Sequence, residues 1–99
     1  MRLNPEQVTT IRNAVRQLAG EEATVHVFGS RLDDTLRGGD IDLLVELPTP
    51  VDNPAQLAAR LSARISRGIH GRKVDVLLSA PNLRPQAIHE IAKRDGEPL

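Results

Sequence analysis

Residues 40–47 read DIDLLVEL, and every second residue within them is aliphatic. Alternation with a period of two predicts a β-strand with two unlike faces. One face carries Ile41, Leu43, Val45 and Leu47, and the other carries Asp40, Asp42, Leu44 and Glu46. Two carboxylates close together on an apolar strand are costly, because like charges repel and burial penalises ionisation. The strand is therefore predicted to have one face for the core and one for chemistry.

Patterns on both sides of this strand predict a small mixed domain. The sequence predicts two further strands and three helices: strands at residues 24–28 and 73–78, and helices at residues 5–19, 54–69 and 85–94. The two long helices each begin at an Asn-Pro pair, in which Asn caps the helix and Pro takes its first position. Residues 31–39 are expected to form a loop or one helical turn. The expected fold class is α/β (α+β), a mixed three-stranded sheet with helices packed on it.

Connection lengths predict how the strands meet. The link between the second and third strands contains a helix, so these strands should be parallel, with a right-handed crossover. The link between the first and second strands is short, which favours an antiparallel pair. One end of the sheet should then hold Gly29 and Ser30 after the first strand, Asp40 and Asp42 in the second, and Asp75 in the third.

Three carboxylates at this end have the chemistry of a magnesium site. Asp40 and Asp42 point the same way, about 6.6 Å apart along the strand. Mg²⁺ prefers hard oxygen ligands. Two ions about 3.5–4 Å apart can clamp the attacking and leaving oxygens of a phosphoryl displacement. Asp75, among apolar residues, can complete one metal site and accept the proton of an acceptor hydroxyl.

The segment after the first strand has the chemistry of a phosphate site. Gly29 permits close approach of the backbone, and Ser30 offers a hydroxyl and a backbone N–H at the start of a turn. Arg31 follows, and its guanidinium suits phosphate oxygens. Mg²⁺ is commonly shared between carboxylates and substrate phosphates. The predicted magnesium site and the predicted phosphate site are therefore expected to form one active site.

These residues form one pattern along the chain: Gly29-Ser30, nine residues, Asp40-Ile41-Asp42-Leu43, and later Asp75. The pattern resembles the DNA polymerase β-like nucleotidyltransferase superfamily, and the small size is similar to its minimal nucleotidyltransferase (MNT) branch. The resemblance covers nearly the whole chain, residues 1–99, as a single domain. Many minimal members read Gly-Ser-Arg-Ala-Arg-Gly, whereas residues 31–37 here read RLDDTLR, so that Arg37 replaces the second arginine.

The resemblance implies a nucleotidyltransferase that moves a nucleoside monophosphate, AMP from ATP, to an acceptor. The nucleotide and two Mg²⁺ ions would be held by the three acids together with Gly29, Ser30, Arg31 and Arg37. Many minimal members act with a helical HEPN-type partner as toxin–antitoxin pairs, and some transfer AMP to the toxin. The alternative function is an inactive antitoxin that only binds such a partner. Transfer to a small molecule such as an antibiotic usually needs a second domain.

Chain length and composition limit the number of domains and the classes of partner that are expected. The 99 residues suit one domain and leave no segment for an acceptor domain, so we expect the active unit to be a complex. The chain has no cysteine, which is compatible with a reducing cytoplasm. Its formal net charge is zero, so nucleic acid binding is not indicated by the global charge, although local patches remain possible. Phe28 is the single aromatic residue.

Other interpretations of the same residues stay open. Asp40 and Asp42 are also compatible with a turn after two glycines, and Asp75 with the surface of an edge strand. The aspartate spacing does not fit an EF-hand Ca²⁺ loop. The three histidines, His26, His70 and His89, are scattered and do not suggest a metal cluster, and His26 is interpreted as structural. Arg60, Arg64 and Arg67 form a basic stripe on one helix, which is either a solvated face or a contact for an acidic partner or RNA.

Overall fold

Two helices and four strands make up the described part of the chain, which comprises residues 3–28, 41–84, 94 and 96–99 of the computed structural model. In chain order they are α1 (Pro5–Ala19), β1 (Thr24–Phe28), β2 (Ile41–Glu46), α2 (Pro54–Gly68), β3 (Val74–Ser79) and β4 (Glu97–Pro98). The helix expected at residues 85–94 and the loop expected at 31–39 lie outside the described residues, apart from Arg94. Neither described helix has the length and apolar run that crossing a bilayer requires.

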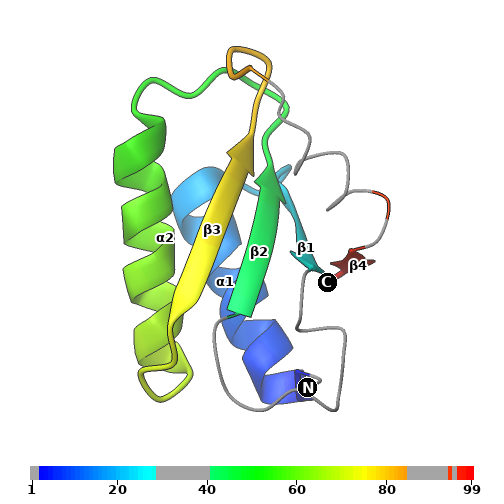
Figure 1. Ribbon diagram of the computed structural model, residues 1–99, viewed down its shortest axis with the longest axis vertical. Coiled ribbons are helices and arrows are strands. Elements are labelled where there is room, and N and C mark those ends of the chain that lie inside the picture. Colours follow the sequence, from blue (N-terminus) through cyan, green and yellow to red (C-terminus); the bar gives the residue numbers. More distant parts are fainter. Residues whose placement is uncertain (1–2, 29–40, 85–93, 95) are drawn as a thin grey trace.

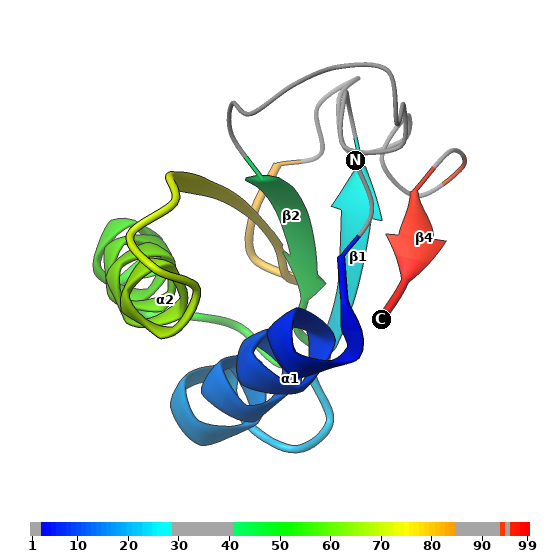
Figure 2. The same ribbon diagram turned by 90° about the horizontal axis from the view of Figure 1, so that it is seen from below.

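The sheet has the strand order β3-β2-β1-β4, and its strands lie side by side in Figure 1. β1 and β2 are antiparallel, whereas β2 and β3 are parallel. Both directions were predicted from the connection lengths and are confirmed. Figure 2 shows α1 and α2 on the same side of the sheet. The fold is therefore a two-layer α+β arrangement, as expected.

Local signals explain where the helices begin. In α1 the Asn4 Oδ1 accepts a 2.8 Å hydrogen bond from the Gln7 backbone N–H, and the Gln7 Oε1 accepts a 2.9 Å bond from the Asn4 N–H. This reciprocal pair is a capping box. In α2 the Asn53 side chain accepts a bond from the Gln56 N–H at 3.2 Å. Both Asn-Pro starts predicted from the sequence are confirmed.

The core lies between the helices and one face of the sheet. The aliphatic face of β2 is fully buried there, with Ile41, Leu43 and Val45 at 0% exposure. The helices contribute Ile11, Ala14, Val15, Leu61 and Ile65 to the same cluster, and the C-cap of α2 contributes Ile69. The opposite face of the sheet carries a second, smaller cluster of Phe28, Leu44 and the half-buried Leu77. The alternation in β2 thus separates two environments, as predicted.

A fourth strand, β4, was missed by the prediction of three strands. Its residues Glu97 and Pro98 pair antiparallel with β1, and the Leu99 N–H donates a 2.9 Å hydrogen bond to the Val25 carbonyl. The two residues are both exposed and include a proline, which cannot donate to a ladder and is tolerated on edge strands. No alternating pattern marks them, so only the tertiary pairing with β1 defines this strand.

The two helices approach each other closely at Gly68. A Cβ atom added there would lie 2.5 Å from the Thr10 Cγ2. Further along, the Arg64 Nη2 donates to the Gln17 Oε1. The α2 residue Ser62 also donates to the Val74 carbonyl, which ties the helix to the start of β3. These contacts fix the helix layer against the sheet.

Gly68→Ala is expected to destabilise the fold by about 1–2 kcal/mol, because overpacking against Thr10 outweighs the gain of about 1 kcal/mol in helix propensity. In a Thr10→Ala background the obstructing methyl is absent, so the same Gly68→Ala change should be neutral or stabilising. Urea unfolding of the four proteins in this cycle measures the coupling. Equal effects in both backgrounds would contradict the close approach.

Candidate active site

The parallel register of β2 and β3 places Asp42 directly opposite Asp75. On the other side of Asp42, the antiparallel register of β2 and β1 places Phe28. The Ile41 N–H donates a 3.0 Å hydrogen bond to the Lys73 carbonyl, which fixes where the β2–β3 ladder begins. The end of β1 and the starts of β2 and β3 therefore meet at one end of the sheet. The sequence predicted this convergence, and it is confirmed for these three strands.

The two carboxylates occupy different environments on the same face. Partner residues on neighbouring strands are about 4.8 Å apart and their side chains share a face. Asp42 is half-buried between the fully buried Ile41 and Leu43, whereas Asp75 is exposed. Two like charges at about 4–5 Å repel by about 1 kcal/mol even in water. A cation bound between them would remove this repulsion.

The carboxylate face is opposite to the helices. The strand alternation directs Leu43 and its equivalents into the core beneath the helices, and Asp42 to the other side. Next to the acids on that side lies the apolar cluster of Phe28, Leu44 and Leu77. Asp42 and Asp75 thus border a largely buried apolar cluster, which lowers the local dielectric and strengthens charge interactions there.

One polar pair on this face was not predicted. The His26 Nδ1 lies 3.7 Å from the Glu46 Oε1. This nitrogen is buried, and it has no hydrogen-bond partner among the residues that the structure describes. In the ladder His26 pairs with Leu44, and Glu46 pairs with Thr24, so the contact is diagonal. The pair lies toward the opposite end of β2 from Asp42. The structural role expected for His26 stays a prediction.

Five of the predicted site residues lie outside the described residues: Gly29, Ser30, Arg31, Arg37 and Asp40. Within the described ranges, no group of three metal-ligating side chains is found. Asp42 and Asp75 nevertheless fit a divalent cation, because they present two hard oxygen donors from adjacent register positions. The described residues account for two of the three predicted acids.

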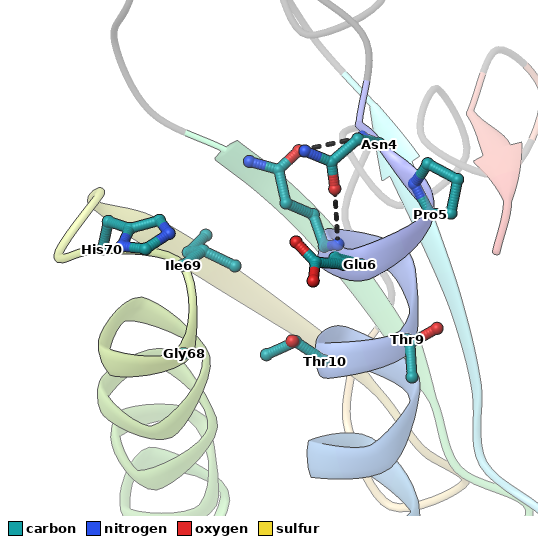
Figure 3. Close-up of a pocket in the computed structure, with 9 residues that line it drawn as sticks. Asn4, Pro5, Glu6, Thr9, Thr10, Gly68, Ile69 and His70 are labelled. Atoms are coloured by element: carbon teal, nitrogen blue, oxygen red, sulfur yellow. Dashed lines mark hydrogen bonds between the residues drawn. The ribbon is translucent and has the colours of Figure 1, made fainter.

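A pocket of about 590 Å³ lies between the start of α1 and the end of α2 (Figure 3). Its lining includes Asn4, Glu6, Thr10 and His70, but neither of the paired aspartates. The helix start is already capped by Asn4, and Glu6 adds a negative charge in the first turn. The pocket is therefore unsuited to a phosphate group.

Comparison with known proteins identifies the pattern. A family model described as "Nucleotidyltransferase domain" matches residues 8–95, most of the chain. The matched range contains both described aspartates and the five predicted site residues that lie outside the described part. No curated protein matches the sequence.

Proposed function

The chain belongs to the nucleotidyltransferase-domain family. We therefore propose that it transfers a nucleoside monophosphate from an NTP to an acceptor hydroxyl, at the end of the sheet that carries Asp42 and Asp75. The observation that carries this proposal is the register pairing of these two carboxylates at the end where β1 stops and β2 and β3 begin. Two acids held side by side repel each other, and a divalent cation bound between them would remove that repulsion.

The proposed chemistry assigns a role to each group. Asp42, Asp75 and the predicted Asp40 would hold two Mg²⁺ ions, which when bound neutralise the phosphate charge. The acceptor oxygen attacks the α-phosphorus, the bond to the β-phosphate oxygen breaks, and pyrophosphate leaves. Asp75 receives the proton of the acceptor, since it is the exposed member of the pair. Gly29, Ser30, Arg31 and Arg37 are proposed to contact the triphosphate.

We further propose that ATP is the donor and that the acceptor belongs to a partner protein, as in a toxin–antitoxin pair in which this chain is the antitoxin. The pattern from Gly29 to Asp75 resembles minimal members with such partners. The single aromatic residue, Phe28, is 9% exposed and packs on Leu44, which leaves no aromatic side chain to stack a base. A HEPN-type helical partner would supply the missing surface. The alternative, an inactive antitoxin, predicts partner binding without transfer.

ATP binding is expected to require Mg²⁺ and the Asp42 carboxylate, because the triphosphate and the acids repel each other without the cation. Calorimetric titration of wild type with ATP should show binding with Mg²⁺ and at least about 10-fold weaker binding with EDTA. Asp42→Asn should lose most of the increase in ATP affinity that Mg²⁺ gives to the wild type.

The matched control is Glu46→Gln, which neutralises an acid on the same face of the same strand, four positions further along. This variant should bind ATP·Mg²⁺ like wild type. If ATP bound equally well with EDTA, or if Glu46→Gln weakened binding as much as Asp42→Asn, the proposed site would be wrong.

A further inference from the structure

The helix layer is strongly basic although the whole chain is neutral. α1 and α2 together carry five arginines and one acidic residue, Glu6. The arginines are Arg12, Arg16, Arg60, Arg64 and Arg67, and all five are exposed. The formal net charge of the chain is zero, so the basic side chains of this layer are balanced by acids elsewhere in the chain. The two helices thus carry a net positive charge of their own.

These arginines are not neutralised within the part of the chain that the structure describes. None of the five forms an ion pair with a described carboxylate, and Arg64 donates to the neutral side chain of Gln17. α2 contains no acidic residue at all. A row of unpaired guanidinium groups on one helix attracts polyanions and repels other cations.

The arginines of α2 form a single line. Arg60, Arg64 and Arg67 are spaced by four and three residues, so they lie on one side of the helix. Arg64 reaches Gln17, which places this line along the junction with α1. At about 1.5 Å per residue the line spans about 10.5 Å. One strand of a nucleic acid duplex presents a phosphate about every 3.4 Å of its axis, so this length covers about three phosphate-to-phosphate intervals, enough for three arginine–phosphate contacts.

Arg12 and Arg16 belong to a different flank. They line a pocket of about 320 Å³ with Glu21, Thr24 and Pro98, at the edge of the sheet formed by β1 and β4. Their guanidinium groups therefore lie away from the α1–α2 junction. The two arginines carry the same charge as Arg60 and Arg67 and are likewise exposed. Substituting them therefore serves as a control for substituting Arg60 and Arg67.

We propose that the line of Arg60, Arg64 and Arg67 binds the phosphate backbone of a single-stranded nucleic acid. Arginine pairs with phosphate through two parallel N–H donors. A protein partner is disfavoured, because the arginine hot spots of protein interfaces are commonly accompanied by Trp or Tyr anchors, and α2 contains neither residue. The exposed neighbours of these arginines on α2 are Ala55, Gln56, Ala59, Ala63 and Gly68, none of which is a large apolar or aromatic residue. Phosphate contacts without such anchors hold a strand without reading its bases.

The position of this line relates it to the aspartate pair. Arg67 lies in the last turn of α2, and Figure 1 shows α2 ending at the end of the sheet where β2 and β3 begin. A strand that follows the arginines is thereby led toward the end of the molecule that carries Asp42 and Asp75. The proposal concerns binding by the helix layer alone. It depends neither on transfer nor on the protein partner proposed above.

The test is fluorescence anisotropy with a labelled oligouridylate of about 12 nucleotides, long enough for one binding site. EDTA is present throughout, so that no Mg²⁺-bridged phosphate contact at the aspartates contributes. For three phosphate contacts to a single strand, a plot of log K against log salt should have a slope of about −2. Affinity should then fall about 20-fold between 50 and 200 mM salt.

The double variant Arg60→Gln/Arg67→Gln should reduce the slope to about −0.7, because one phosphate contact remains. The double variant Arg12→Gln/Arg16→Gln should leave the slope at about −2. Both pairs remove two positive charges and keep Arg64 bonded to Gln17. Circular dichroism checks that both variants fold. The proposal is overturned if no binding occurs at low salt, if the two variants behave alike, or if polyglutamate of equal charge binds at least as tightly. The last result would assign the surface to an acidic protein.

Discussion

Asp75→Asn is expected to lower nucleotide transfer about 10²- to 10⁴-fold while changing ATP·Mg²⁺ affinity only a few-fold. Asp75 is exposed on the edge strand β3, beside the half-buried Asp42. The exposed member is accessible to an incoming acceptor, whereas the half-buried one is better placed to keep a metal ion. Asparagine preserves the size of the side chain but cannot accept the proton.

The measurement uses ATP labelled at the α-phosphate, because that group stays with the acceptor. The wild-type chain alone should show little transfer, and adding lysate of the source cells should label a protein band. Asp75→Asn should lose this label, and Asp52→Asn, at an exposed aspartate before α2, should keep it. Undiminished labelling by Asp75→Asn would refute its role. Robust transfer to a small molecule without lysate would refute the partner proposal.

Much of the fold follows from patterns of neighbouring residues. The aliphatic face of β2 has a strict period of two, and both helices begin at an Asn cap followed by Pro. Such local signals predicted α1 and β1 at their observed bounds, and α2 to within one residue. Strand directions followed from the lengths of the connections. For β3 the prediction began one residue early, at Lys73, whose carbonyl does accept the first ladder bond.

Features that depend on distant partners were not predicted. β4 exists through its pairing with β1, and the residues around Pro98 have no strand pattern of their own. The contact between His26 and Glu46 depends on the register of β1 and β2, which a shift of one residue would abolish. Nothing in the spacing of these two residues along the chain indicates it.

The placement of Asp42 and Asp75 at the same end of the sheet was predictable, because it follows from the strand topology. Asp42 and Asp75 needed only a parallel pair of strands with both acids near their starts. Their direct pairing, residue opposite residue, came from the structure. The difference in exposure between them also came from the structure, since it depends on β2 being central and β3 being an edge. In the proposed mechanism, this difference is the reason that Asp75, rather than Asp42, is assigned the additional role of accepting the proton.

Leu43→Ala is expected to cost about 3–4 kcal/mol, because it removes a large side chain from the centre of the core. Leu43 is 0% exposed in the central strand, where it pairs with Val27 on one side and Val76 on the other. Truncating it to the Cβ atom leaves a cavity beneath both helices that a rigid sheet cannot close. The free energy of unfolding of a domain of this size is about 5–15 kcal/mol. The expected loss is a large part of it, so the melting temperature should fall by more than about 10 °C.

The matched control is Leu77→Ala, which makes the same truncation at a half-buried position on the edge strand and on the opposite face. It should cost about 1 kcal/mol, because less apolar area leaves water and no closed cavity forms. Adding ATP·Mg²⁺ at about 100 times its Kd should restore about 2.7 kcal/mol to Leu43→Ala, as it does for wild type. Asp42 is the next residue, so a collapse of β2 would abolish that gain. Equal losses from the two truncations would show that the core is not centred on β2.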